Sequence, residues 1–412
     1  MGRVGREPHQ GQGHVPLLVV GQGPASAAAE PDRRHHPVSD ARGRYGLYIH
    51  VPFCSSICSY CHFARTDRHD SGLRRRYAEA LVREYELRSE ACPALGSGHR
   101  RLATCYLGGG TPSLLEPENL RRVLAGTLGR SETVDDPEVT AEANPESLTA
   151  ELATVWREAG INRVSLGVQS LDDHVLRLLG RDCDAATTAR GLELACARFD
   201  RVAADWILGP GVELASLCDQ LDRAVDLGVE HFSLYLLEVH RGTALQQDLA
   251  AGKLAMPRDA KFEHLYLGAV RHLAKRGVRQ YEVANFARPG AESRHNSAYW
   301  RGVPYLGLGP GAHGFSGRGR YANPGAVEAW LAPLEGGRLP DGPVDPLDLQ
   351  ARRLERVILG LRTTQGVPLA WLPAGFDPEP ERADRLWDVR EGRLVLTSRG
   401  FLRIDTIEEF LA

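Results

Sequence analysis

Short apolar runs typical of β-strands alternate with helical patterns over most of the chain, and few folds accommodate this alternation. Repeated β-α units with apolar strands form parallel sheets covered by helices. This many units fit a full or partial barrel better than a small open sheet. The predicted fold class is therefore α/β, a partial (β/α)6-type barrel. The expected strands are Gly46–Val51, Leu102–Leu107, Glu138–Ala143, Arg163–Val168, Arg201–Leu208, His231–Leu237 and Gln280–Ala284.

Helical patterns between these strands end at glycines, where helix C-caps are expected. The first helix shows apolar residues on one broad face. The expected helices are Leu73–Ser89, Leu152–Ala159 before Gly160, Leu217–Leu227 before Gly228, and Lys261–Arg276 before Gly277.

The pattern changes at both ends of the chain. Residues 1–44 are rich in Gly, Pro, His and Arg without a period, so we expect a disordered or atypical extension. Residues 45–335 should form the barrel and its extension. Residues 340–412 should form a small α+β domain of winged-helix type, with helices near Leu349–Leu361 and Ile407–Leu411 and a strand at Arg393–Thr397.

Composition excludes several classes of protein. The chain is 42% hydrophobic and 25% charged, with a net charge of −3, which is ordinary globular usage and argues against disorder, collagen and coiled coils. No apolar run is long enough to span a bilayer, and no basic excess suggests nucleic-acid binding. We expect a soluble cytoplasmic protein without a membrane-spanning segment or nucleic-acid partner.

The cysteines point to a metal site. Cys54, Cys58 and Cys61 crowd into eight residues just after the first expected strand. In a cytosolic chain of this size, a tight cluster indicates metal binding and not a disulfide framework. The other five cysteines are expected to be small buried hydrophobic residues; they are Cys92, Cys105, Cys183, Cys196 and Cys218.

Two kinds of metal centre fit this cluster. A structural zinc site needs four protein ligands, and His50 or His62 could supply the fourth. A cubane iron–sulfur cluster held by three cysteines instead leaves one iron open to a small molecule. The compressed spacing directly after a strand favours the cubane.

Polar and glycine residues also collect where successive strands end. The second strand ends in the run Gly108–Pro112, and glycines there let another molecule approach the backbone. Glu142 ends the third strand, Gln169 ends the fourth, and Asp205 lies in the fifth. Carboxyl ends of barrel strands are where barrel enzymes bind ligands, so these residues indicate a binding site.

The three-then-two cysteine spacing after a barrel strand resembles the radical S-adenosylmethionine (SAM) superfamily. The resemblance implies that Cys54, Cys58 and Cys61 hold a [4Fe–4S] cluster whose open iron binds SAM. Electron transfer into the sulfonium then releases methionine and a 5′-deoxyadenosyl radical, and the difficult chemistry belongs to the cofactors. An electron donor such as flavodoxin or ferredoxin is implied as a partner.

Residues from about 45 to 330 resemble, more narrowly, the family that contains oxygen-independent coproporphyrinogen III oxidase and the heme chaperone HemW. The matching segments are Tyr48–Cys54, Gly108–Pro112, Glu142–Pro145, Gly167–Ser170, Gly180–Arg181 and Gln280–Gly290. By position, the resemblance implies SAM contacts from Tyr48, Tyr60, Gly109, Gly110, Thr111, Glu142, Gln169, Arg181 and Asp205.

Two features favour the chaperone branch of this family. The oxidase branch has a fourth cysteine two residues after the third ligand, where this chain has Phe63. The segment Arg294–Trp300 matches the His-Asn-x-x-Tyr-Trp pattern that the chaperone branch associates with heme, and Tyr305–His313 also fits that branch. The implied heme contacts are His295, Asn296, Tyr299, Trp300 and His313.

The preferred functional hypothesis is therefore a heme chaperone that carries a [4Fe–4S] cluster and SAM and delivers heme to an acceptor protein. An oxidoreductase that decarboxylates coproporphyrinogen III, or a relative of it, is the alternative. A zinc-stabilised binding module is a third. His295 and Asn296 could also simply hydrogen-bond a loop to the barrel.

Overall fold

The computed structural model describes residues 43–92, 95, 100–317, 319–340, 342, 344–346, 348–373, 376 and 385–411. The extension predicted for residues 1–44 lies almost entirely outside these described residues.

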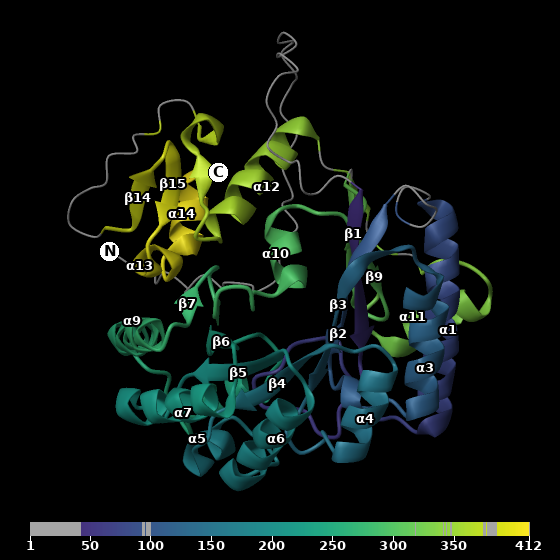
Figure 1. Ribbon diagram of the computed structural model, residues 1–412, viewed down its shortest axis with the longest axis horizontal. Helices are drawn as coiled ribbons and strands as arrows, with labels where there is room; N and C mark the ends of the chain where they lie inside the picture. Colours follow the sequence, from purple (N-terminus) through teal and green to yellow (C-terminus); the bar gives the residue numbers. More distant parts are fainter. Residues whose placement is uncertain are drawn as a thin grey trace, which may run out of the picture.

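Six parallel strands form the centre of the molecule (Figure 1) and confirm the predicted α/β fold class. They are β1 Arg44–Val51, β2 Arg101–Gly109, β3 Thr133–Ala143, β4 Arg163–Gln169, β5 Val202–Leu208 and β6 His231–Leu236. Each pairs with the next in sequence order, as a β-α barrel requires.

Shorter strands extend both edges of this sheet. They are β7 Arg279–Gln280, β8 Asn285–Ala287, β9 Tyr305–Leu308, β10 His313–Phe315, β11 Gly319–Ala322 and β12 Val344–Pro346. In the described residues the order is β12-β11-β10-β9-β1-β2-β3-β4-β5-β6-β8-β7. Strand β9 is parallel to β1, whereas β8 is antiparallel to β6.

The prediction of one strand over Gln280–Ala284 is wrong. The chain turns there, because the amide of Tyr281 bonds to the carbonyl of Asn285 (3.1 Å) and the amide of Val283 bonds to Arg362 (2.9 Å). These bonds leave only the two-residue β7 before the turn and the antiparallel β8 after it.

Helices follow the strands and cover the outside of the sheet (Figure 1). They are α1 Ser71–Ala91, α3 Pro117–Gly126, α4 Ala150–Glu158, α5 Asp173–Leu178, α6 Ala185–Arg198, α7 Leu214–Leu227, α8 Ala244–Ala250, α9 Asp259–Lys275 and α11 Val327–Glu335, with 3-10 turns η1 Pro112–Leu114 and η2 Leu128–Arg130. Helix α10 Arg294–Trp300 instead lies against inward-facing side chains of β2 and β3. The predicted glycine at the end of α7 is confirmed, since Gly228 caps it at φ +103°.

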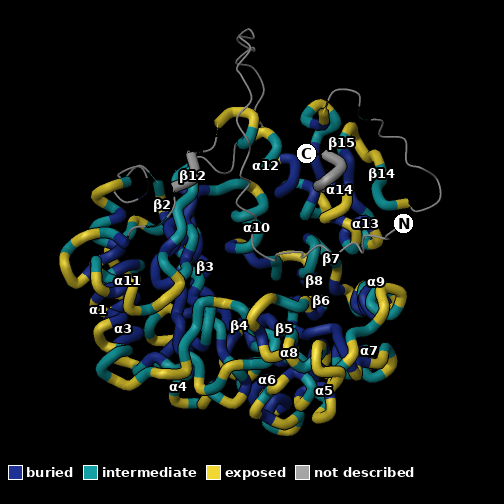
Figure 2. The backbone as a smooth tube through the Cα atoms, turned by 180° about the vertical axis from the view of Figure 1, so that it is seen from behind, coloured by how far each residue is buried: buried dark blue, intermediate teal, exposed yellow. Residues whose placement is uncertain are grey.

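Alternation along each strand separates the two sides of the sheet. On β1, Leu47, Ile49 and Val51 are fully buried in the hydrophobic core beneath the helices. The intervening Tyr48 and His50 point the other way and bond to each other inside the barrel (3.0 Å). Figure 2 shows the strands buried and the outer helix faces exposed.

The C-terminal region is α+β, as predicted. It contains α12 Leu349–Leu361, β13 Val367–Pro368, η3 Leu369–Trp371, β14 Trp387–Arg390, β15 Arg393–Leu396, α13 Ser398–Phe401 and α14 Ile404–Leu411. Its antiparallel sheet has the order β13-β15-β14. A second hydrophobic cluster around Val357, Leu361 and Leu394 lies here, separate from the barrel core. The domain boundaries given above stay a prediction.

Among the described helices, none combines the length and the apolar character that a membrane crossing needs.

Candidate functional site

The three clustered cysteines lie on an irregular loop directly after β1. The loop is anchored at its start, because the amide of Cys54 bonds to the carbonyl of Thr66 (3.0 Å) and Phe53 is fully buried. All three thiols are free and partly exposed. The sequence therefore places three sulfurs on one loop at the carboxyl ends of the strands.

Side chains from neighbouring strand ends reach two of these sulfurs. The hydroxyl of Thr111, after β2, lies 3.8 Å from Cys54 Sγ, and a guanidinium nitrogen of Arg181 lies 3.6 Å from Cys58 Sγ. Burial raises the pKa of Cys54 to about 11 and also raises the pKa of Cys61. Burial therefore disfavours the thiolate form of these cysteines. A bound metal would offset this effect, since a thiol that ligates a metal is deprotonated.

The two histidines considered as a fourth zinc ligand both have other contacts. Within the described residues, no three His, Cys, Asp or Glu side chains are grouped closely enough to hold a single metal. His50, one candidate for a fourth zinc ligand, uses both ring nitrogens, with Tyr48 (3.0 Å) and the carbonyl of Ala64 (2.6 Å). His62, the other, packs against His240 with ring centroids 3.5 Å apart.

The glycine run after β2 forms a close backbone approach. Gly109 has φ +109°, and a Cβ there would lie 2.4 Å from the His50 ring. A Cβ on Gly110 would lie 2.7 Å from the carbonyl oxygen of Phe53. Only glycine fits these two positions, so the run brings bare backbone next to the cysteine loop.

Two predicted carboxylic acids lie half-buried inside the barrel. Glu142 accepts hydrogen bonds from the Tyr106 hydroxyl (2.7 Å) and the Gly109 amide (3.1 Å), and burial raises its pKa to about 7. Asp205 lies within hydrogen-bond range of the Ser165 hydroxyl (3.4 Å), and burial raises its pKa to about 6. Both are placed to accept hydrogen bonds from a ligand's hydroxyl groups.

Arg181 and Gln169 complete the rim near the cysteines. The Arg181 guanidinium is 5% exposed and donates to Asn144 (3.1 Å) and the Gly167 carbonyl (3.3 Å), while its Nε atom has no partner. Gln169 adopts φ +62°, a left-handed conformation that is uncommon outside glycine and often marks functional positions.

The geometry brings most of the predicted SAM contacts to one end of the barrel and adds a residue that was missed. Asn144 bonds to both Arg181 (3.1 Å) and the Thr111 hydroxyl (3.4 Å), and so links the two side chains that touch the sulfurs. The sequence did offer a sign of this role, because Asn144 follows Glu142 by two residues at the same strand end. Tyr60 is half-buried on the cysteine loop.

The predicted heme segment lies at the opposite end of the barrel. His295 is 2% exposed on α10, and its ring nitrogens contact the Thr104 hydroxyl (2.8 Å) and the Tyr299 hydroxyl (2.7 Å). Burial lowers its pKa to about 3. Glu138 lies on β3, and its side chain faces the barrel interior. Its carboxylate accepts hydrogen bonds from the backbone amides of Arg294 (3.1 Å) and His295 (2.9 Å).

The other predicted heme contacts are less closely grouped. Asn296 and Trp300 lie with His295 on α10, where Trp300 Nε1 is buried without a hydrogen-bond partner. His313 starts β10, whose far end pairs with Tyr305 at the base of the barrel. The two histidines therefore lie at opposite ends of β9 and β10.

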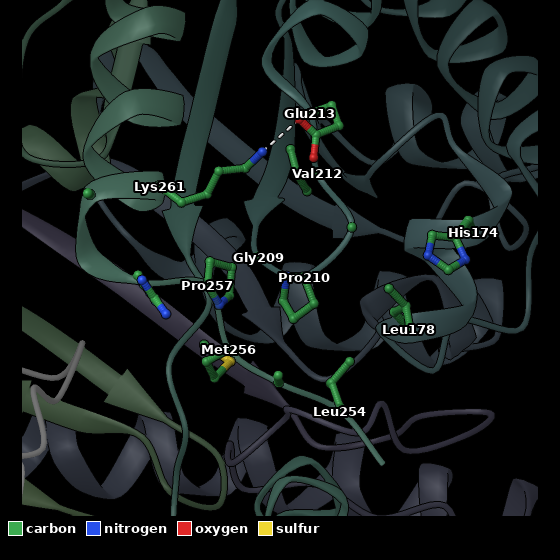
Figure 3. A pocket seen from close by; sticks show the side chains of 14 residues that line it. His174, Leu178, Gly209, Pro210, Val212, Glu213, Leu254, Met256, Pro257 and Lys261 are labelled. Carbon is green, nitrogen blue, oxygen red and sulfur yellow. Dashed lines mark hydrogen bonds and ion pairs between the residues drawn. The ribbon is translucent and has the colours of Figure 1, made fainter. Parts of the chain in front are cut away.

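A separate cavity of about 670 Å³ lies beyond the end of β5, between α5 and α9. Figure 3 shows Lys261 and Glu213 paired on one side of it, with His174 and Leu178 on another. None of the predicted site residues lines this cavity.

Comparisons with known proteins agree with this architecture. The family model described as the radical SAM superfamily matches residues 48–224. The solved coproporphyrinogen III oxidase HemN from Escherichia coli is similar in fold, with a TM-score of 0.73 at 23% identity over 89% of both chains. The protein therefore has the fold of the radical SAM class, with a matching domain over residues 48–224.

Sequence relatives narrow the class. The heme chaperone HemW of Mycobacterium tuberculosis is 39% identical over 88% of this chain and 93% of its own length. HemW of Bacillus subtilis is 33% identical over 78% of this chain and 84% of its own. A mitochondrial radical S-adenosyl methionine domain-containing protein 1 from Bos taurus is 35% identical over 84% of this chain and 76% of its own length. The chain belongs to the HemW family of radical SAM proteins.

Proposed function

We propose that Cys54, Cys58 and Cys61 hold a [4Fe–4S] cluster. The thiols are free, share one loop, and receive donor groups from Thr111 and Arg181. Such donors stabilise negative charge on cluster sulfurs. When bound, the cluster supplies one-electron chemistry to SAM at its open iron, with electrons from a donor such as flavodoxin or ferredoxin.

The SAM site would lie along the strand ends beside this loop. The backbone of Gly109 and Gly110, which have no side chains, and that of Thr111 would line this site, and Glu142 and Asp205 would accept hydrogen bonds from sugar hydroxyls. Arg181, with its unpartnered Nε atom, would hold the carboxylate of the amino acid portion. Tyr48, Tyr60 and Gln169 complete the proposed contacts and limit the access of water.

The protein would act as a heme chaperone that delivers heme to an acceptor protein. Placement of the Arg294–Trp300 segment carries this proposal, because α10 is held inside the barrel by the carboxylate of Glu138. An imidazole is a sound iron ligand, and Tyr299 and Trp300 offer flat apolar surfaces to a porphyrin. Ligation through His295 requires one of its two ring hydrogen bonds to break.

Heme titration followed by the Soret band tests the heme part of the proposal. His295→Ala should weaken heme binding by about tenfold or more, the range expected for loss of one metal ligand or its support. His264→Ala, an exposed histidine on α9, is the matched control and should bind as the wild type does. Equal affinity of His295→Ala and the wild type would remove His295 as a ligand.

Two further measurements test the cluster and the chaperone role. Iron and sulfide should be lost in anaerobically reconstituted Cys58→Ala and kept in Cys196→Ala, which changes a partly buried cysteine on α6. Anaerobic incubation with coproporphyrinogen III, SAM and a reductant should give no protoporphyrinogen. Sustained turnover would instead establish the oxidase activity.

A further inference from the structure

Arg163 is a buried arginine without a carboxylate partner. It begins β4, is 3% exposed, and its Nη2 atom makes no hydrogen bond. Among the described residues, its guanidinium forms no ion pair; the carboxylate that its charge acts on is Asp205, whose pKa it lowers against the larger effect of burial. Burying a charge without an ion-pair partner is unfavourable. A bound anion would reduce this unfavourable free energy.

Thr140 lies beside Arg163 on the inner face of the sheet. The two residues are direct partners in the register of β3 and β4. Thr140 is fully buried, and its hydroxyl also has no hydrogen-bond partner. A second polar group that could donate to an anion therefore stands next to the guanidinium.

His231, at the start of β6, supplies a third unused donor. It is 3% exposed, and its Nε2 atom lies 2.8 Å from the Tyr281 hydroxyl. That hydroxyl accepts the backbone amide of Ser293 (3.2 Å) and can give its own proton to Nε2. The ring proton of neutral His231 then sits on Nδ1, which has no partner.

The nearby carboxylic acids do not satisfy these donors. Both oxygens of Glu138 accept backbone amides of α10, and Asp205 is within reach of the Ser165 hydroxyl. The charge of Arg163 contributes to the lowered pKa of both His231 and His295, after the larger effect of burial, and it opposes the rise that burial causes in the pKa of Asp205, with which it forms no ion pair. Arg163 is therefore electrostatically close to both histidines.

We propose that Arg163, Thr140 and His231 bind a carboxylate at the base of the barrel interior, and that this carboxylate is a propionate of a tetrapyrrole. Three unused donors and a positive charge match one carboxylate, which accepts several hydrogen bonds. The barrel base also holds His295, so one ligand could engage both. Heme as the tetrapyrrole rests on the proposed function, whereas the carboxylate chemistry does not.

The test measures binding of hemin and of coproporphyrin III, each as the free acid and as the fully methylated ester, to the full chain. Arg163→Met should raise the Kd of an acid by about tenfold or more, as expected for a lost hydrogen-bonded charge pair, and leave ester binding unchanged. Arg163→Lys keeps the charge, so its Kd for an acid should lie between those of the wild type and Arg163→Met. Arg201→Met is the control, since Arg201 is 42% exposed and pairs with Asp136 on the surface.

The outcomes separate this inference from the proposed function. Arg163-dependent binding of hemin supports both. Arg163-dependent binding of coproporphyrin III without hemin binding keeps the site and overturns the heme chaperone role. Wild type and Arg163→Met binding both acids equally, equal losses for acids and esters, or no tetrapyrrole binding at all would overturn the inference.

Thermal unfolding of the ligand-free protein gives an independent readout. Replacing an unpartnered buried charge by an apolar side chain is often neutral or stabilising, so Arg163→Met should unfold at the wild-type temperature or above it. A clear decrease would mean that Arg163 already has a structural partner, and would overturn the proposal.

Discussion

Glu84 is the side chain whose replacement should destabilise the barrel most clearly. It is fully buried on α1. One carboxylate oxygen accepts from Arg88 (2.7 Å) and Asn323 (2.8 Å), and the other accepts from the Gly309 amide (2.8 Å) and the Trp330 indole (2.9 Å). This one carboxylate therefore joins α1 to α11 and to the turn after β9.

Glu84→Gln keeps the shape and removes the charge. The new amide group has one acceptor oxygen, so its NH2 group faces two of the four donors and leaves them unsatisfied, at about 1–3 kcal/mol each. Removing one partner of a buried ion pair costs about 3–5 kcal/mol. These costs overlap, and we expect a loss of about 3–5 kcal/mol in the free energy of unfolding.

Urea and thermal unfolding of the apo protein measure this loss. At about 2 °C per kcal/mol for a large domain, the melting temperature should fall by about 6–10 °C. The matched control is Glu79→Gln on the same helix, whose pair with Arg122 (2.8 Å) is 56% and 41% exposed; it should cost less than about 1 kcal/mol. Similar losses in both variants would refute the reasoning that burial makes the difference.

Three further predictions concern the proposed SAM site. Burial raises the pKa of Glu142 to about 7, so the folded state binds the carboxyl proton more tightly than the unfolded state does. The free energy of unfolding should therefore fall as pH rises from about 4.5 to 7. Glu142→Gln should lessen this fall in thermal unfolding measured across the same pH range. Gly109→Ala should abolish SAM binding measured by calorimetry, because its Cβ has no room, whereas Gly160→Ala, also at positive φ but with open space around it, should only lower stability. Arg181→Met should weaken SAM binding about tenfold or more, and Arg190→Met, on the exposed face of α6, should not.

The six central strands could be predicted because each carries apolar residues that are buried against helices. The edge strands could not. Strands β9 to β11 are three or four residues long and interrupted by Gly307, Gly309 and Gly314, so they show no sustained alternation. Their positions depend on tertiary contacts such as the bond from Glu84 to the Gly309 amide.

The proposed site at the cysteine loop was largely predictable, because carboxyl ends of parallel strands meet at one edge whatever the exact register. Residues at the other ends of the strands were not. Thr104 and Glu138 bond to α10 only because the register of the barrel brings their strands together beneath it. No local pattern in the sequence distinguishes such inward-facing polar residues from exposed ones.

The turn between β7 and β8 is joined to the C-terminal region by two backbone hydrogen bonds and one side-chain hydrogen bond. The amide of Val283 bonds to the carbonyl of Arg362 (2.9 Å), the amide of Thr364 bonds to the carbonyl of Tyr281 (3.1 Å), and Ser398 bonds to Gln280 (2.8 Å). The stretch that follows this turn leads directly into α10 and His295. A protein that bound the C-terminal sheet would therefore contact a region joined by hydrogen bonds to the segment that precedes α10. Its binding would act on the position of His295 from a site remote from the cysteine loop.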